Sequence, residues 1–331
     1  MYSSLMADVP SEGTSLFNSA AGRLPPPPKV ETEECEGGVC EFKRPQRKTT
    51  GPASQPVGSG SGAVGPRDIS ESTGGAVDSG DITLPPRPSK GGYSIIVHQI
   101  WIQGEAALPD KFKPVVAAYR RLNSEYILWD HFLIRELIRR HYPYLLEVYD
   151  NYEFWVMKVD LGKYVILCHY GGFYVDMDTQ PYKSFASLAL LSEGLPLMEV
   201  VDDDWRVKMY FRNFVNNHFF YIPYPDDPFM HYLLSCVPHT AQRPFFRFMI
   251  EHILGSIGPM FVMDCIERYI EGGGKVTLYS SSVIRPYFTH EGHVSWLSKR
   301  WFDGQDKITI LVLTCLAVLV FLSMKRHPGS A

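Results

Sequence analysis

Strong charge of either sign and abundant cysteine are both missing from this 331-residue chain. Its 32 Lys and Arg residues nearly balance its 36 Asp and Glu residues, giving a formal net charge of −4. This balance excludes a strongly basic nucleic-acid-binding protein. Six cysteines in a chain of this length exclude a small disulfide-stabilised scaffold. The first thirteen residues lack a basic stretch followed by an apolar core, so we expect no secretory signal peptide at this end.

Aromatic residues are nearly absent from the first 90 residues. This stretch holds three of the 44 Phe, Trp and Tyr residues, but 12 of the 25 prolines and 12 of the 27 glycines. Such a segment cannot bury enough apolar surface to offset the entropy of ordering its chain. We therefore predict a disordered tail over residues 1–90, which serves either as a spacer or as a docking arm for a proline-recognising partner.

Long uncharged apolar runs are also scarce, and the one that stands out is Ile308–Met324. As a helix, its seventeen residues would span roughly 25 Å at about 1.5 Å per residue, enough for a thin bilayer. We predict a single transmembrane helix over residues 307–325 and a short tail over 326–331, with a buried core helix as the alternative. Basic residues are nearly equal in number on both sides of the run, which leaves its orientation open.

Apolar periodicity divides the central part of the chain into alternating strands and helices. Strands are expected in three short runs of apolar and aromatic residues: 94–97, 126–129 and 173–175. Helices are expected where apolar residues recur at spacings of three and four: 112–119, 134–141 and 161–168. Gly171 is expected to end the third helix. This alternation predicts one α/β domain over residues 91–306, built around a largely parallel sheet.

Two carboxylates follow the last of these strands. Asp176 and Asp178 are two residues apart, and residues i and i+2 of a strand point to the same side. We therefore expect them to converge at the carboxyl end of a sheet strand, where open α/β folds bind ligands. Adjacent carboxylates repel each other unless a cation lies between them. Mn²⁺ or Mg²⁺ would satisfy both and bridge to a substrate diphosphate; a solvated turn is the alternative.

Two further groups of polar residues flank this pair in the sequence. Asp160 and Lys163 share a helix face at i, i+3 and could form hydrogen bonds with the hydroxyls of a sugar. We expect Asp160 at the start of its helix, where an acid is favourable in any case. The segment His290–Trp296 brings a histidine, a hydroxyl and an indole within seven residues, which suits a metal–diphosphate site. A polar surface loop is the alternative for that segment.

Taken together, these motifs resemble one known family. In chain order they are Val97–Trp101, Leu128–Asp130, Asp160–Tyr164, Tyr170–Asp178, Gly258–Pro259 and His290–Trp296. This order is similar to that of the glycosyltransferases with a DXD sugar-binding region, family thirty-two. The family includes the fungal initiating α-1,6-mannosyltransferase and the inositol phosphoceramide mannosyltransferases, and it is distantly similar to the clostridial glucosylating toxins. The resemblance covers residues 94–302 and implies a GT-A fold, in which an α/β sheet binds the nucleotide and carries the DxD at its edge.

The resemblance implies how the donor would be bound. Trp101 would stack on the nucleotide base, and Asp160 and Lys163 would contact the donor sugar. Lys163 stands where the family usually has Arg, so it keeps the charge but loses the bidentate fork. Asn216 and Asn217 fall where the family often has a donor-side or acceptor-side Asn.

The resemblance also implies a metal–diphosphate centre. Asp176 and Asp178 would hold Mn²⁺ together with the ribose and diphosphate of the donor, and His290 would complete the metal shell. Ser295 and Trp296 would contact the diphosphate and its leaving oxygen.

The activity implied by the resemblance is metal-dependent, retaining glycosyl transfer at a membrane, from a nucleoside-diphosphate sugar to a hydroxyl of a lipid or glycan. No residue stands out as a covalent nucleophile, so we expect front-face attack by the acceptor, assisted by the leaving phosphate. The alternatives are a catalytically weak nucleotide-sugar-binding or scaffold protein that acts through its proline-rich tail, and a metal-dependent phosphohydrolase. The family implies a Golgi or ER membrane with a lumenal site, whereas the missing signal peptide and the C-terminal anchor favour a cytosolic catalytic face.

Overall fold

The computed structural model describes residues 82–88, 92–201, 214–244, 247–291, 306–310 and 312–314. Most of the predicted disordered tail lies outside the described residues. So do Ser295, Trp296 and the greater part of the predicted transmembrane helix.

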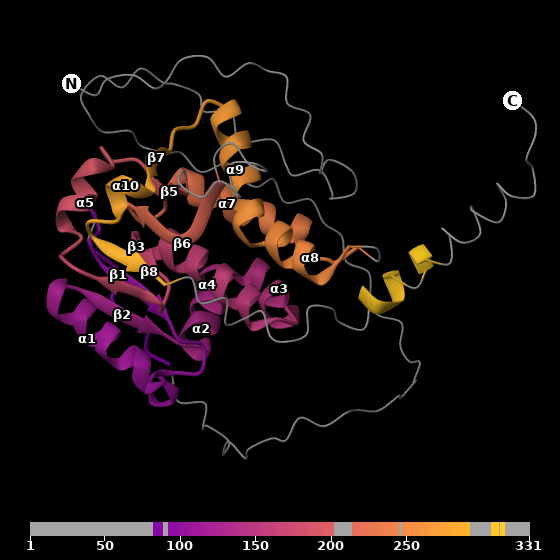
Figure 1. The fold of residues 1–331 in the computed structure, drawn as a ribbon, viewed down its shortest axis with the longest axis horizontal. Helices are drawn as coiled ribbons and strands as arrows, with labels where there is room; N and C mark the ends of the chain where they lie inside the picture. The colour runs from indigo at the N-terminus through magenta and orange to yellow at the C-terminus, as the bar shows by residue number, and fades with distance from the viewer. Residues whose placement is uncertain are drawn as a thin grey trace, which may run out of the picture. The chain divides into compact units, whose positions relative to one another are not determined.

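A six-stranded mixed sheet forms the centre of the domain (Figure 1). Its strands are β1 (Val97–Ile100), β2 (Tyr126–Trp129), β3 (Gly172–Val175), β5 (Leu197–Val201), β6 (Phe214–Ile222) and β7 (Thr277–Ser280). Their order in the sheet is β2-β1-β3-β6-β5-β7. The predicted α/β sheet is confirmed, but β1 begins three residues later than expected. The strand includes the polar His98 and Gln99, which are buried and hydrogen-bonded.

The sheet is largely parallel, as predicted, because β6 alone among its six described strands runs opposite to the others. β1 runs parallel to β2 and β3, and β5 runs parallel to β7, whereas β6 is antiparallel to both of its neighbours. β5 and β6 are consecutive strands that pair directly with each other.

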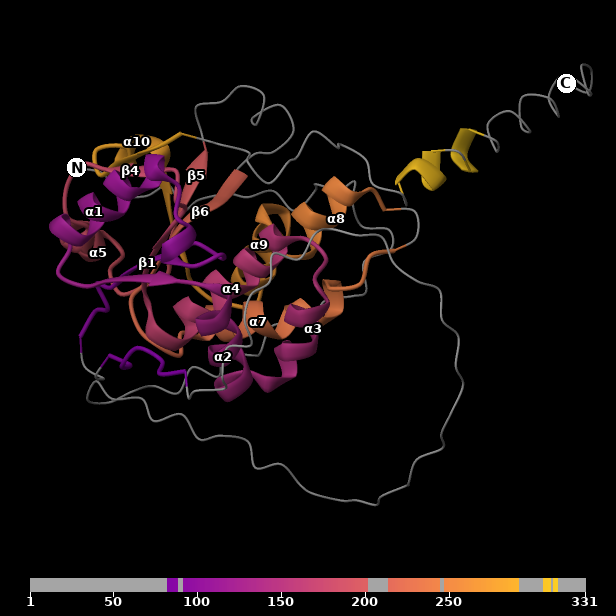
Figure 2. The ribbon, with the colours of Figure 1, turned by 90° about the horizontal axis from the view of Figure 1, so that it is seen from below.

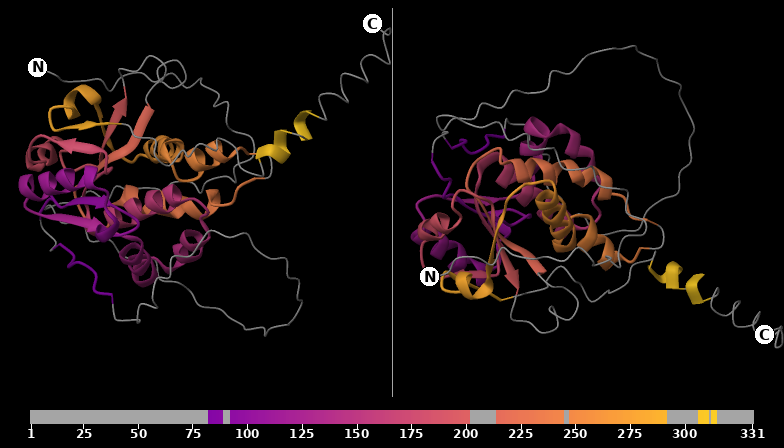
Figure 3. Two further views of the ribbon diagram at one scale, coloured as in Figure 1. Left: turned by 60° about the horizontal axis from the view of Figure 1, so that its bottom comes forward. Right: turned by 90° about the horizontal axis from the view of Figure 1, so that it is seen from above.

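Alternating side chains of the strands build a hydrophobic core on each face of the sheet. On β6, Phe219 and Tyr221 face one core while Phe220 and Ile222 face the other. The larger core packs against α2 (His131–His141), α3 (Leu146–Asn151), α4 (Trp155–Tyr170), α7 (Pro228–Thr240), α8 (Met249–Ser256) and α9 (Pro259–Glu271). The smaller core packs against α1 (Lys113–Leu122), α5 (Ala186–Leu191) and α10 (Ser281–Ile284). Figures 2 and 3 show the orange helices α7, α8 and α9 gathered away from α1 and α5. Short 3-10 helices cover Glu105–Ala107, Asp110–Phe112 and Pro143–Leu145.

Helix α4 runs through the core and leads directly into β3. It begins at Trp155, so Asp160 lies inside the helix rather than at its start, and that prediction was wrong. The buried Met157 extends the apolar spacing one turn before Leu161, which explains the earlier start. The helix ends at Gly171, as predicted, with a φ of 63°. Gly172 has a φ of 87°, and a Cβ there would lie 2.4 Å from the carbonyl oxygen of Ile96, so a side chain cannot fit.

A small two-stranded sheet joins two distant parts of the chain. β4 (Thr179–Pro181) pairs in antiparallel fashion with β8 (Phe288–His290), and Thr179 lies opposite His290. The amide of Glu291 donates to the carbonyl oxygen of Asp178 at 3.0 Å. The pairing therefore carries His290 to the turn that contains the two aspartates.

Two apolar segments near the C-terminal end bear on membrane association. Met249–Glu271 is long and apolar enough to span a membrane, but over half of its apolar window is buried in the protein. The chain also bends at Ile257 and Gly258, which separates α8 from α9. The described residues 306–310 and 312–314 are helical, and they contain the first part of the predicted transmembrane run. There the side chains of Ile308, Ile310 and Leu313 are exposed.

Candidate functional site

The two aspartates of the DxD motif lie in a tight turn between β3 and β4. β3 ends at Val175, and the amide of Thr179 donates to the carbonyl oxygen of Asp176 at 3.2 Å, closing the turn. The prediction that Asp176 and Asp178 converge as alternate residues of a strand was therefore wrong in its geometry. The chain reverses here because β4 pairs with β8.

The aspartates nevertheless converge, and His290 joins them. Ligand atoms of Asp176, Asp178 and His290 all lie within 4.8 Å of one another, and His290 Nε2 is 3.3 Å from Asp178 Oδ1. Burial alone would lower the pKa of His290, but the hydrogen bond to Asp178 and the surrounding carboxylates outweigh it and raise the pKa. The surplus of negative charge and the donor set of two carboxylates and one imidazole fit a hard divalent cation.

Asp176 is held in place from three directions. The Tyr174 hydroxyl donates to Asp176 Oδ1 at 2.8 Å, and the Gln99 side chain donates to the Asp176 carbonyl oxygen at 3.1 Å. The Asp176 amide donates to the carbonyl oxygen of His218 at 3.0 Å. One oxygen of the carboxylate is therefore fixed by β3 itself, and the backbone is fixed by β1 and β6.

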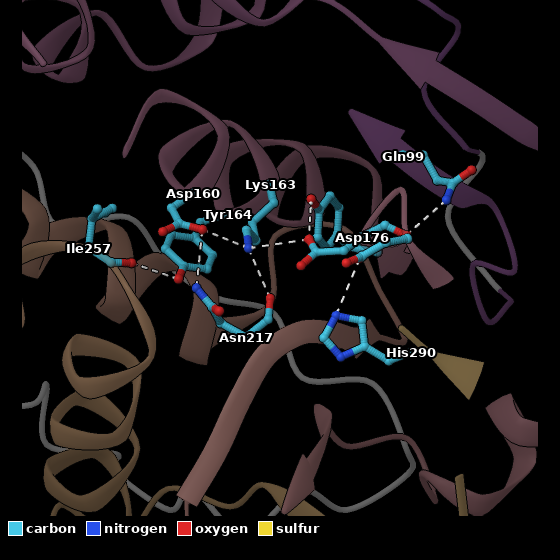
Figure 4. Close-up of polar contacts among 10 residues, drawn as sticks. Gln99, Asp160, Lys163, Tyr164, Asp176, Asn217, Ile257 and His290 are labelled. Carbon is cyan, nitrogen blue, oxygen red and sulfur yellow. Dashed lines mark hydrogen bonds and ion pairs between the residues drawn. The ribbon is translucent and has the colours of Figure 1, made fainter. Parts of the chain in front are cut away.

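A buried ion pair from α4 stands beside this cluster (Figure 4). Lys163 Nζ lies 2.7 Å from Asp160 Oδ1 and 3.9 Å from Asp176 Oδ1. It also donates to the carbonyl oxygen of Asn217 on β6 at 2.9 Å, while Asn217 Nδ2 donates to Asp160 Oδ1 at 3.1 Å. The predicted pairing of Asp160 and Lys163 on one helix face is thus present, with both side chains at most 7% exposed.

The raised pKa of Asp160 shows that burial disfavours the ionised form of its carboxyl group. Removal from water raises the pKa to about 6, although Lys163 and the Asn217 amide both favour the carboxylate. The charge of Asp176 raises it further. Asp160 is therefore a carboxylate whose ionised state depends on Lys163.

One cavity of about 550 Å³ is lined by all five ionisable side chains of the site: Asp160, Lys163, Asp176, Asp178 and His290. Trp101 and Phe112 line it as well, with their ring centroids 5.5 Å apart, and the Trp101 indole donates to the carbonyl oxygen of Ala107 at 3.1 Å. Asn216 and Asn217 also line the cavity. Ser295 and Trp296, predicted to contact the diphosphate, lie outside the described residues.

Sequence reasoning missed two residues behind His290. The His218 ring stacks on the His290 ring, with centroids 4.1 Å apart and planes 5° apart. His218 Nε2 lies 2.8 Å from Glu199 Oε2, and both side chains are buried. Burial would raise the pKa of Glu199, but the neighbouring His218 outweighs it and the pKa is lowered. The sequence does contain one indication of this pair, because Glu199 is a charged residue within the otherwise apolar strand Leu197–Val201.

Comparison with known proteins agrees with this geometry. Residues 112–195 match the family described as the glycosyltransferase sugar-binding region containing DXD motif. The matched stretch contains both aspartates of the turn and the buried ion pair of α4. The chain is a glycosyltransferase, and over these residues it is similar to the DXD family.

Several curated relatives share the enzyme's class. An uncharacterized glycosyltransferase of Acanthamoeba polyphaga mimivirus is 23% identical over 65% of this chain and 90% of its own length. A mannosyl phosphorylinositol ceramide synthase of Saccharomyces cerevisiae is 27% identical, over 56% of this chain and 44% of its own. An inositol phosphoceramide mannosyltransferase of Schizosaccharomyces pombe is 24% identical, over 69% of this chain and 70% of its own length. The glycosyltransferase thus spans under half of the Saccharomyces relative but most of the viral one.

Among solved structures, the PaToxG glycosyltransferase is similar at 16% identity with a TM-score of 0.37. The match covers 57% of this chain and 73% of that one.

Proposed function

We propose that this glycosyltransferase moves a hexose from a nucleoside-diphosphate sugar to a hydroxyl of a lipid or glycan, with a divalent metal ion and a GT-A-type fold. The proposal is supported mainly by the side chains that line one cavity. Two carboxylates and an imidazole with metal-ligand spacing stand there beside a buried Asp160–Lys163 pair, which can hydrogen-bond sugar hydroxyls.

Different side chains of the cavity would contact different parts of the donor. Trp101 and Phe112 supply an aromatic wall for the nucleotide base, and Asp176, Asp178 and His290 hold Mn²⁺ or Mg²⁺ at the diphosphate. Held by these three residues, the ion would supply positive charge opposite the diphosphate as that group leaves. Lys163 stands 3.9 Å from Asp176 and adds a fixed positive charge beside the same group.

We propose a retaining reaction. The bond between the anomeric carbon and the diphosphate oxygen breaks, and the acceptor oxygen bonds to the same face of that carbon. The acceptor proton passes to the leaving diphosphate. Ser295 and Trp296, which the family resemblance assigns to the diphosphate, complete the proposed site. Analysis of the product by NMR tests the stereochemistry, and an inverted anomeric centre would contradict it.

The names of the relatives favour mannose as the transferred sugar and a sphingolipid headgroup as the acceptor. We further propose that the chain is anchored by Ile308–Met324 in a Golgi or ER membrane. The exposed apolar residues of the described part of that run support this assignment.

A panel of nucleoside-diphosphate sugars tests the proposed function. The purified full-length chain is incubated with each donor and Mn²⁺, and release of nucleoside diphosphate is followed, with the double variant Asp176→Ala/Asp178→Ala as the control. We expect turnover of at least one donor, abolished by the control variant and by a chelator. Equal rates for wild type and control with every donor would instead favour a sugar-nucleotide-binding or scaffold protein.

A further inference from the structure

Part of the cavity wall is apolar and does not belong to the donor site described above. It is formed by Trp155, Val156 and Val159 from the start of α4, together with Ile253 and Leu254 from α8. None of these five side chains carries a charge. The Trp155 side chain is 53% exposed although it lines the cavity, so this apolar wall reaches from the cavity to the surface.

The apolar wall adjoins the segment that leads into the predicted membrane anchor. The Asp306 carboxylate accepts a hydrogen bond from the amide of Met249, the first residue of α8, at 2.9 Å, and it pairs with Arg243. Asp306 is 1% exposed, so this junction is buried. Ile253 follows Met249 by one helical turn, a rise of about 6 Å. Helix α8 therefore connects the first residues of the C-terminal helix with the cavity.

We propose that the apolar wall binds the hydrocarbon part of a lipid acceptor and presents the headgroup hydroxyl to the donor sugar. The proposal rests on the proposed function and names the acceptor class for the same site. A free glycan would need hydrogen-bonding partners along its path, and the five side chains of the wall offer one indole N–H between them. Hydrocarbon needs only contact area, and an indole is suited to the boundary between a bilayer and water.

The position of the wall explains how the acceptor would arrive. The proposed anchor begins at Ile308, two residues after the Asp306 junction with α8, so insertion of that anchor would bring α8 and the wall close to the bilayer surface. A lipid then reaches the metal cluster by moving along α8 and the first turn of α4, without leaving the bilayer surface completely.

The test compares lipid transfer with donor hydrolysis for the same full-length protein in detergent micelles. The donor is the best one from the panel. The probe acceptors are inositol phosphoceramide in the micelle and, separately, methyl α-mannoside in solution. The variants are Trp155→Ser and Leu254→Ser, and Leu190→Ser is the matched control because Leu190 is 68% exposed on α5, at the other core of the sheet.

We expect the ratio of lipid transfer to donor hydrolysis to fall about tenfold or more in each wall variant, because each removes a large apolar contact. Leu190→Ser should keep the wild-type ratio, and Trp155→Phe should restore most of it because it retains apolar area. Brominated acyl chains should also quench tryptophan fluorescence more strongly in the wild type than in Trp155→Phe. That readout requires no turnover.

Three outcomes would overturn the proposal. Wild-type ratios in both wall variants would show that the wall does not bind the acceptor. Transfer to methyl α-mannoside with none to the lipid would assign the site to a glycan. Absence of donor hydrolysis in the wild type would refute the proposed function itself, and with it this inference.

Discussion

The buried pair of Asp160 and Lys163 gives a quantitative test of the site. In Lys163→Met, the apolar stem is retained and the ammonium is lost. The Asp160 side chain, 7% exposed, then loses its ion pair and keeps the hydrogen bond from Asn217. Removing one partner of a buried ion pair costs about 3–5 kcal/mol, because the remaining charge is left uncompensated.

The pH dependence of that loss follows from the pKa of Asp160. The pKa of Asp160 is already raised to about 6 by burial, and loss of Lys163 raises it further. A carboxyl whose pKa is higher in the folded than in the unfolded state stabilises the fold fully below the unfolded value of 3.8. That contribution is lost as the pH rises through the folded value. Lys163→Met should therefore lose much less stability at pH 5 than at pH 8.

Urea unfolding, followed by tryptophan fluorescence at both pH values, measures this difference. The double variant Asp160→Asn/Lys163→Met removes both charges and should recover more than half of the loss at pH 8. A stability of Lys163→Met within about 1 kcal/mol of the wild type at pH 8, against the loss of about 3–5 kcal/mol expected for a buried pair, would contradict this prediction. An equal loss at both pH values would also refute it. Donor turnover should be lost in both variants.

Three further predictions concern positions around the site. Gly172→Ala places a Cβ 2.4 Å from the carbonyl oxygen of Ile96 at a φ of 87°, so thermal unfolding should show a loss of about 2 kcal/mol or more. Burial lowers the pKa of His98 to about 3, so its contribution to stability is complete above pH 6.5 and is lost as the pH falls toward 3. Acid titration of the unfolding free energy should be flatter in His98→Phe. His218→Ala removes the ring stacked on His290, and calorimetry should show Mn²⁺ binding weakened about tenfold or more, with His218→Phe closer to the wild type.

Local patterns predicted many of the individual elements of the fold. The apolar spacing located α1, α2 and the second half of α4, and Gly171 marked the end of α4 because its φ of 63° favours glycine. The direction of β6 was not predictable in this way, since an apolar strand has the same local pattern in a parallel and an antiparallel pair. That direction is set by which strands become neighbours.

The residues of the candidate site likewise fall into those that local sequence predicts and those that depend on tertiary packing. The DxD aspartates, Asp160 and Lys163 are visible in the sequence, because each pair is local in the chain. Glu199 and His218 are not, since they meet where the β5–β6 register shifts between Met198 and Val200. Such an irregularity depends on tertiary packing, and it places a buried acid and a buried histidine next to each other without any fixed sequence spacing.

The position of His290 depends on packing beneath it rather than on the β4–β8 pairing alone. A two-stranded sheet is marginally stable by itself, and this one has three paired residues in each strand. Phe288, two residues before His290 on the same strand, is buried against Phe185 and Phe219 of the smaller core. That anchor fixes the register opposite Thr179, and the register places the imidazole at the aspartate turn. The geometry of the cluster of Asp176, Asp178 and His290 is therefore set by aromatic packing, which holds His290 beside the DxD motif although it lies about 110 residues further along the chain.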